Sequence, residues 1–162
     1  GNMVQYKEPL SVQEVIQRVV DLMRAEAEHK KIDLQFSASP ETPLIHADRN
    51  SMEEIFTNLI SNAIKYTPEQ GKVWVALGEE KGFVKTSVSD TGIGIEEKDL
   101  SRIFDKFYRV KTTETRQIVG TGLGLSIVQS IVAAHLGSIS VESKVGAGTT
   151  FTILLPKEST PN

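Results

Sequence analysis

The stretch NLISNAIKYT, residues 58–67, joins an apolar helix pattern to a stripe of polar side chains. Projected at about 100° per residue, Asn58, Asn62 and Lys65 fall within roughly 80° of one another, together with Glu54. The apolar residues of the same segment gather on the opposite side and are Met52, Ile55, Phe56, Leu59, Ile60, Ala63 and Ile64. The pattern predicts an amphipathic helix that packs its apolar side on a core.

We expect this helix to begin at a cap provided by Asp48 and to end near Thr67 and Pro68. Its polar stripe is compatible with an ordinary solvated surface. Asn is nevertheless a mediocre helix former, because its side chain competes for nearby backbone groups. Two asparagines one turn apart therefore indicate a second interpretation, in which the stripe contacts a ligand, and spacing alone leaves both open.

The chain has 162 residues, a formal net charge of -3 and no cysteine. This length is typical of one domain. Without cysteine the chain has no disulfide scaffold, zinc ribbon, iron–sulfur site or thiol nucleophile. The slightly acidic balance opposes a general nucleic-acid-binding surface. No apolar run reaches the roughly 20 residues that a membrane span needs.

Hydrophobic periodicity predicts the other elements. A capping box at Ser11 and Glu14 starts a first helix that runs to about His29. Strands are expected at 32–36, 73–77, 83–88 and on either side of 146–148. A short apolar piece lies at 44–45 and a turn at 79–82. A last helix is expected at about 122–136, ended by Gly137. The closing strand pairs are hairpins, so we expect a mixed sheet with helices layered on one face.

Three glycine-rich segments lie between these elements. The run DTGIGI, residues 90–95, directly follows a predicted strand, where glycine allows close approach of the backbone to a ligand. The run GTGLGL, residues 120–125, directly precedes the last helix, whose N-terminus is suited to phosphate. Neither has the spacing of a dinucleotide fingerprint or of a Walker loop. Each is a tight turn or a ligand loop, and we interpret 146–148 as a plain hairpin turn.

The segment IFDKFYR, residues 103–109, lies between the first two glycine runs. We interpret Phe104 and Phe107 as aromatic side chains packed on the core. Residues 105–120 then lack clear periodicity, and a segment of that length is typical of a functional lid or of disorder.

In this order and at these distances, four segments resemble the boxes of the catalytic and ATP-binding domain of bacterial sensor histidine kinases. Residues 58–67 resemble the asparagine box of that family, 90–94 its first glycine box, 104–107 its phenylalanine box and 120–124 its second glycine box. Each box alone is unspecific, whereas four in series over nearly the whole chain are specific.

The resemblance implies an α+β fold, a two-layer α/β sandwich of the Bergerat type. Its sheet would be mixed, mostly antiparallel and five-stranded, with about three helices on one face and a mobile ATP lid at about 106–119. Residues 1–162 would form a single catalytic domain, with 1–10 as the lead-in from a dimerisation hairpin. We interpret Gly1 and Asn2 as an expression scar.

The same resemblance implies that the chain binds ATP and Mg²⁺. Asn62 would hold Mg²⁺, which prefers oxygen ligands and takes few groups from protein. Lys65 would contact phosphate, and Tyr66 would lie along the nucleoside. Asp90 would accept a hydrogen bond from the adenine amino group, with support from Thr149. The other nucleotide-binding residues would be Asn58, Gly92, Gly94, Ile95, Arg109, Arg116, Gly120, Gly122, Leu123, Gly124 and Leu125.

Lys65, Arg109 and Asn58 are the residues that we expect to act in catalysis. ATP-hydrolysing relatives of the implied fold resemble one another in having Glu one turn before the Mg²⁺ asparagine, where this chain has Asn58. An amide is a poor base, so hydrolysis should be slow and transfer to a delivered nucleophile favoured. Arg109, with Arg116, would neutralise phosphate charge from the lid.

We therefore interpret the chain as the ATP-binding part of a cytoplasmic protein-histidine kinase of two-component signal transduction. Its partners would be the phosphoacceptor helical hairpin of a homodimeric parent kinase and a response regulator, with no nucleic acid and no membrane contact. One alternative is an anti-sigma-type serine kinase of the same fold, which Asn58 and the phenylalanine box oppose. A non-catalytic nucleotide-binding docking module is the other.

The phosphoacceptor histidine itself is not expected within the chain. His29 ends the first helix, His46 precedes Asp48, and His135 lies in the last turn of the third helix, so none fits a Ser-His-Glu-like acceptor stretch. Alone, the chain should show little turnover. For His135 we expect an imidazolium that interacts with the carboxyl end of its helix.

Overall fold

The computed structural model describes residues 6–108 and 124–158. Its elements in chain order are β1 (Lys7–Leu10), α1 (Val12–His29), β2 (Asp33–Ala38), β3 (Ile45–Asp48), α2 (Arg49–Lys65), β4 (Lys72–Glu80), β5 (Phe83–Asp90), α3 (Glu97–Leu100), α4 (Gly124–Ala134), β6 (Ser138–Lys144) and β7 (Gly148–Pro156).

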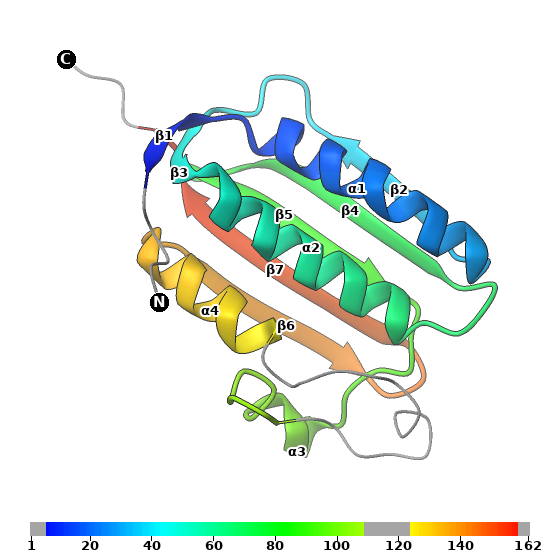
Figure 1. Ribbon diagram of the computed structural model, residues 1–162. Helices are drawn as coiled ribbons and strands as arrows, with labels where there is room; N and C mark the ends of the chain where they lie inside the picture. The colour runs from blue at the N-terminus through cyan, green and yellow to red at the C-terminus, as the bar shows by residue number, and fades with distance from the viewer. Residues whose placement is uncertain (1–5, 109–123, 159–162) are drawn as a thin grey trace.

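Within these described residues, five strands form one sheet in the order β2-β4-β5-β7-β6. β2 and β4 are parallel, and the other neighbouring pairs are antiparallel. The helices α1, α2 and α4 lie side by side over one face of this sheet (Figure 1). The expected two-layer α+β sandwich, with a mixed and mostly antiparallel sheet, is confirmed.

The core lies between the two layers. On β4, Val73, Val75 and Leu77 face the helices and are buried, whereas Trp74 between them is 42% exposed. The predicted apolar side of α2 is buried in full and consists of Met52, Ile55, Phe56, Leu59, Ile60, Ala63 and Ile64. Each large aliphatic side chain buried in this way stabilises the fold by about 1.5–3 kcal/mol, so this side fixes α2 on the sheet.

Both predicted helix starts are confirmed. Ser11 Oγ accepts the backbone N–H of Glu14 at 3.3 Å in the first turn of α1. Asp48 Oδ1 accepts the backbone N–H of Ser51 at 3.1 Å in the first turn of α2. These side chains satisfy N–H groups that have no partner within the helix.

The structure adds elements that periodicity does not predict. β1 and β3 pair antiparallel as a separate two-stranded sheet, in which Lys7 lies opposite Asp48. Each of these strands is four residues long, too short for an alternating pattern. The short helix α3 is also new. Strand β4 continues to Glu80 and β5 begins at Phe83, so the turn expected at 79–82 is limited to Lys81 and Gly82.

Gly137 was expected to end the last helix, but the residue with the left-handed conformation at the end of α4 is Leu136. Leu136 has the left-handed conformation, with φ 60°, and the N–H of Gly137 bonds to the carbonyl of Val132 at 3.0 Å. A Cβ atom on Gly137 would lie 2.4 Å from the carbonyl oxygen of Leu154 on β7. The contact with the sheet therefore requires glycine at 137 and leaves Leu136 in the position that glycine usually takes at a helix end.

His135 is neutral and buried, so the expected imidazolium at the end of α4 is wrong. Its Nδ1 donates to the carbonyl of Ile131 at 2.9 Å, and its Nε2 accepts the backbone N–H of Asp48 at 3.2 Å. Burial is the main cause that lowers the pKa of His135. Protonation of Nε2 would break the bond to Asp48, so His135 joins α4 to the start of α2 only in its neutral form.

Acidification should destabilise the fold through His135. Because its pKa is depressed in the folded state, the unfolded chain binds more protons between the two values. The stabilisation is complete above the unfolded pKa of about 6.5 and is lost as the pH falls through the folded value. Urea unfolding over this range should show a steeper acid loss in the parent chain than in His135→Gln. His29→Gln, at an exposed site, is the matched control, and parallel profiles for all three proteins would contradict the assignment.

Thr86 is a polar residue at a helix-facing position of β5. It is 1% exposed, and its Oγ1 is the one buried side-chain polar atom without a hydrogen-bond partner in the part of the chain that the structure describes. Thr86→Val should raise the free energy of unfolding by about 1 kcal/mol, because a methyl group replaces an unsatisfied hydroxyl. Thermal unfolding measures this, with Thr152→Val on the outward side of β7 as control. A lower melting temperature for Thr86→Val would refute it.

Candidate functional site

One row of helix-facing side chains on β5, β7 and β6 is polar. Strand register places Asp90 of β5 opposite Thr149 of β7, and Thr149 opposite Ser143 of β6. The next helix-facing row on the same strands is apolar and consists of Val88, Phe151 and Val141. The surface beneath the helices therefore ends in three polar side chains.

Asp90 is a largely buried acid with backbone partners. Its Oδ1 accepts the N–H of Gly92 at 2.8 Å, and the N–H of Thr149 also donates to its carboxylate. Burial raises the pKa of Asp90, and these two hydrogen bonds oppose the rise because they favour the ionised form. A carboxylate has about four acceptor positions, so Asp90 can accept a further hydrogen bond from a ligand.

The loop that follows β5 packs against the end of α2. The N–H of Ile93 donates to the carbonyl of Tyr66, the C-cap residue of α2, at 3.2 Å. A Cβ atom on Gly92 would lie 2.5 Å from this same carbonyl oxygen. Glycine at 92 therefore permits the approach that brings the end of α2 next to Asp90.

The same loop, residues 90–95, is bonded to the hairpin of β6 and β7. The N–H of Ile95 donates to Ser143 Oγ at 2.7 Å. Gly94 has φ 77°, and a Cβ atom there would lie 2.2 Å from the carbonyl oxygen of Lys144. The loop is thus fixed between the helix layer and the sheet.

The expected hairpin turn at 146–148 is confirmed between β6 and β7, and Gly148 in addition packs against the end of β5. Gly148 has φ 112°, and a Cβ atom on it would lie 1.9 Å from the carbonyl oxygen of Asp90. Gly146 has φ 82° and no neighbour within 4 Å of its Cβ position. Only Gly148 is needed for the contact between β7 and the end of β5.

The amide stripe of α2 lies next to the first turn of α4. A Cβ atom on Gly124 would lie 2.9 Å from Asn58 Oδ1 and 4.0 Å from Asn62 Nδ2. Both asparagines are half-buried, and Asn58 Nδ2 donates to the carbonyl of Glu54 at 2.8 Å. Figure 1 shows the N-terminal end of α4 beside α2. Asn58 and Asn62 therefore lie beside a helix end suited to anions, which is the setting that the ligand interpretation requires.

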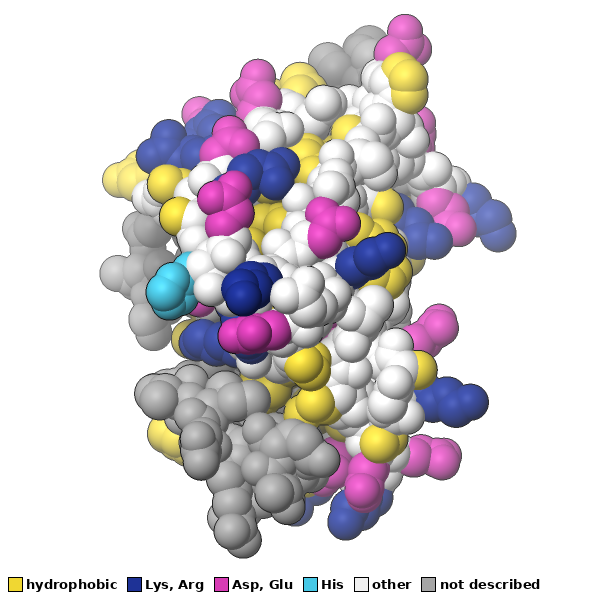
Figure 2. Space-filling model, turned by 90° about the vertical axis from the view of Figure 1, so that its right-hand side faces the viewer, with side chains coloured by type: hydrophobic (Ala, Val, Ile, Leu, Met, Phe, Trp, Pro, Cys, Tyr) yellow, Lys and Arg dark blue, Asp and Glu magenta, His cyan; other side chains and the backbone are white. Residues whose placement is uncertain are grey.

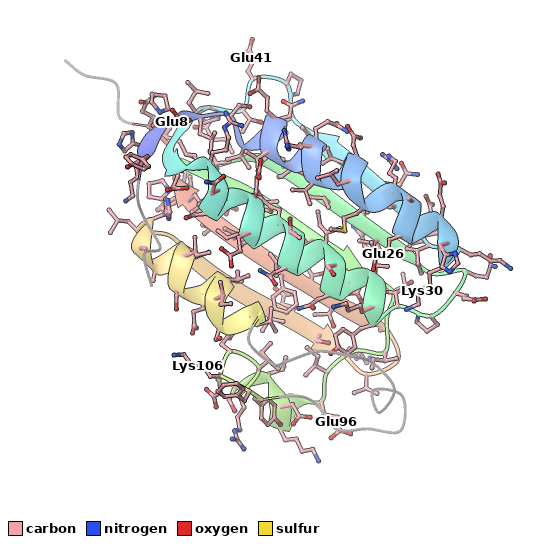
Figure 3. The ribbon with its side chains drawn as sticks, viewed as in Figure 1. Glu8, Glu26, Lys30, Glu41, Glu96 and Lys106 are labelled. Carbon is pink, nitrogen blue, oxygen red and sulfur yellow. The ribbon has the colours of Figure 1, made fainter. Side chains whose placement is uncertain are left out.

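Lys30 holds the last turn of α2, a role that sequence reasoning missed. From the C-cap of α1, its Nζ donates to the carbonyls of Ile64 and Lys65 at 2.8 and 2.7 Å. Desolvation lowers the pKa of Lys30, against the raising effect of Glu26, which stands near it in Figure 3. The sequence could have indicated this role, because Lys30 directly follows a predicted helix and cations are favourable near the C-terminal carbonyl groups of helices. The side chain of Lys65 is exposed.

The two phenylalanines of the box differ in environment. Phe104 packs edge-on against Phe151, with ring centroids 6.3 Å apart, as expected for a core contact. Phe107 is 71% exposed with φ 65°, so its expected packing on the core is wrong. The next aromatic residue, Tyr108, is held instead, because it donates its hydroxyl proton to Asp99 of α3.

The structure brings most described candidates into two groups along α2. One group, at loop 90–95, consists of Tyr66, Asp90, Gly92, Gly94, Ile95 and Thr149. The other group, where α2 meets the first turn of α4, consists of Asn58, Asn62 and Gly124. Leu125 packs its side chain against the core. The candidates outside the described residues are Arg109, Arg116, Gly120, Gly122 and Leu123. The structure also adds Ser143 to the candidate residues. In the sequence, this serine could have been noticed as a polar residue at a strand position that faces the helices.

Figure 2 shows a face on which acidic and basic side chains are interspersed. Among residues 6–108 and 124–158, no group of three or more His, Cys, Asp or Glu is placed to hold a metal ion. No helix in these ranges has the length and apolar character needed to cross a membrane.

Comparisons with known proteins agree with this arrangement. A family model described as histidine kinase-, DNA gyrase B- and HSP90-like ATPase matches residues 47–159. The sensor histidine kinase WalK of Bacillus subtilis is 45% identical over 114 residues, covering 69% of this chain and 19% of WalK. This chain thus spans about a fifth of the length of that relative.

Solved structures are similar over nearly the whole chain. The catalytic domain of the histidine kinase ThkA, in a nucleotide-free form, has a TM-score of 0.82 and 31% identity and covers 94% of this chain and 97% of its own. Full-length ShkA in complex with AMPPNP has a TM-score of 0.84 and 30% identity, covering 99% of this chain and 33% of its own.

Substitution of Gly148 should test the contact beneath Asp90. Gly148→Ala should lower the free energy of unfolding by about 3 kcal/mol or more, because strain at positive φ adds to overpacking. Gly146→Ala in the same hairpin should cost only about 1 kcal/mol, since it carries the conformational strain alone. Chemical denaturation measures both changes. Equal losses of unfolding free energy in the two variants would show that the close packing of Gly148 against Asp90 does not contribute to stability.

Proposed function

Because the chain belongs to the histidine kinase-, DNA gyrase B- and HSP90-like ATPases, as a histidine kinase catalytic domain, we propose that it binds Mg²⁺-ATP and donates the γ-phosphoryl group to a histidine of its parent kinase. The observation that carries the proposal is that one helix, α2, meets Asp90 and loop 90–95 at its C-terminal end through Tyr66 and meets the first turn of α4 through Asn58 and Asn62.

The adenine end of the proposed site is at Asp90. Its carboxylate is held by the N–H groups of Gly92 and Thr149, so its free acceptor positions have a fixed direction. The adenine amino group is a donor that matches them. The half-buried Tyr66 at the end of α2 lies next to Gly92 and lines the nucleoside.

The phosphate end lies between α2 and α4. The first turn of α4 offers N–H groups and the positive end of the helix dipole to phosphate oxygens. Gly124 has no side chain to fill the space beside Asn58 and Asn62. The carbonyl oxygen of Asn62 fits a hard cation such as Mg²⁺, which neutralises triphosphate charge when bound. Lys65, exposed one turn further on, supplies a cation near the same face.

Asn58 favours transfer over hydrolysis. Its Nδ2 is used by the carbonyl of Glu54, and its Oδ1 faces Gly124, so this amide has no basic group with which to activate water. Phosphoryl transfer needs positioning and charge compensation more than covalent help from the protein. We propose Arg109 and Arg116 for part of that compensation, within a lid at about 106–119.

The acceptor and the wider assembly belong to the parent kinase. We propose that residues 1–162 form one catalytic domain, that 1–10 lead in from a phosphoacceptor hairpin, and that the parent works as a cytoplasmic-facing homodimer with a response regulator. Within the described part, Lys7–Leu10 are the strand β1, paired with β3.

Calorimetric titration with ATP tests the nucleotide site. The parent chain should bind ATP at least about tenfold more tightly with Mg²⁺ than with EDTA. Asn62→Ala should lose this difference, because the amide that would bind Mg²⁺ is removed. Asn50→Ala, at the exposed start of α2, is the matched control. Unchanged Mg²⁺ dependence in Asn62→Ala would sink the metal assignment.

Transfer of label from ATP to a separate sensor-kinase hairpin tests the reaction. Acid-labile label on the hairpin is expected, since phosphohistidine is unstable in acid. Acid-stable label would instead support a serine kinase of the same fold. ATP binding without any label on the hairpin would favour a docking module.

A further inference from the structure

We propose that Ser143 is a positioning residue for base selection: it fixes the hydroxyl of Thr149 as an acceptor, so that the site discriminates against a base with a carbonyl in place of the adenine amino group. The inference rests on the proposed function, in which Asp90 receives adenine.

Ser143 stands behind the two residues that face the proposed base. It lies on the helix-facing side of β6, directly across from Thr149, which in turn lies across from Asp90. The preceding helix-facing residues of β6, Ile139 and Val141, pack against the apolar core. A serine that ends this series is a polar group among enclosed neighbours, so its hydrogen bonds must be satisfied locally.

Three groups surround the hydroxyl of Ser143. The N–H of Ile95 lies 2.7 Å from its Oγ, the carbonyl oxygen of Gly148 lies 3.0 Å away, and the hydroxyl oxygen of Thr149 lies 2.8 Å away. A serine hydroxyl has one proton to donate and two acceptor positions. The first neighbour can only donate and the second can only accept.

The direction of the third bond follows from this count. The proton of Ser143 goes to the carbonyl of Gly148, which has no proton to offer. All three contacts are then hydrogen bonds only if the hydroxyl of Thr149 donates to Ser143. If Ser143 donated to Thr149 instead, two oxygens without a proton between them would be left 3.0 Å apart at Gly148.

Thr149 is thereby left with acceptor positions alone on its side chain. Its hydroxyl proton is directed to Ser143, and its backbone N–H donates to Asp90. Thr149 is 7% exposed, so water cannot easily reorient this hydroxyl. Asp90 and Thr149 then present acceptors together, which suits an amino group with two N–H donors and repels a carbonyl oxygen.

The ATP and inosine triphosphate affinities of Ser143→Ala test the proposal. Removing the Ser143 hydroxyl frees Thr149 to turn its proton toward the base. Inosine triphosphate has a carbonyl where ATP has its amino group. The preference for ATP over inosine triphosphate, measured by calorimetry with Mg²⁺, should fall about fivefold, the equivalent of one hydrogen bond. Ser143→Thr, which keeps the hydroxyl, should retain the preference.

The ratio of the two affinities separates this role from a structural one. Any loss of folded protein weakens both nucleotides equally and leaves the ratio unchanged, so an unchanged ratio in Ser143→Ala overturns the proposal. Ser140→Ala, at an exposed position of the same strand, should keep the parent ratio. A parent chain that binds neither nucleotide would overturn the proposed function itself, whereas ATP binding with an unchanged ratio overturns only the role of Ser143.

Discussion

A carboxylate within the helix-facing surface of the sheet is the constraint on which the site depends. An enclosed acid must receive hydrogen bonds, because burial otherwise penalises its charged form. Gly92 and Thr149 supply backbone N–H groups to Asp90. This requires the loop to turn back on its strand and β7 to approach without a Cβ at Gly148. The same loop then meets the carbonyl of Tyr66, which sets where α2 ends relative to the sheet.

Long periodic segments could be predicted from the sequence because neighbours along the chain determine them. The two faces of α2, its cap at Asp48 and the hairpins of β4–β5 and β6–β7 all follow from local spacing and turn residues. The candidate site was predicted chiefly by four boxes in series. Chain spacing alone left the amide stripe undecided, since it cannot show that Asn58 and Asn62 lie beside the start of α4.

The features that sequence could not predict depend on partners far along the chain. His135 is neutral because it meets Asp48 from another element, and Leu136 takes the left-handed conformation because Gly137 is needed against β7. Phe107 is exposed although its neighbour Phe104 packs on the core. Composition and periodicity do not depend on these contacts, so the expected protonation of His135 and the expected burial of Phe107 were wrong.

The sheet joins two hairpins, β4–β5 and β6–β7, through the pairing of β5 with β7. That pairing closes the chain between Ile95 and Gly124 as a loop whose ends are fixed by the fold on both sides. The entropic cost of closing a flexible loop grows only with the logarithm of its length, about 0.6 kcal/mol for each doubling. Within that segment, residues 97–108 are tied to the fold by α3 and by the contact of Phe104 with Phe151, so a change of length at these residues costs packing as well as loop entropy.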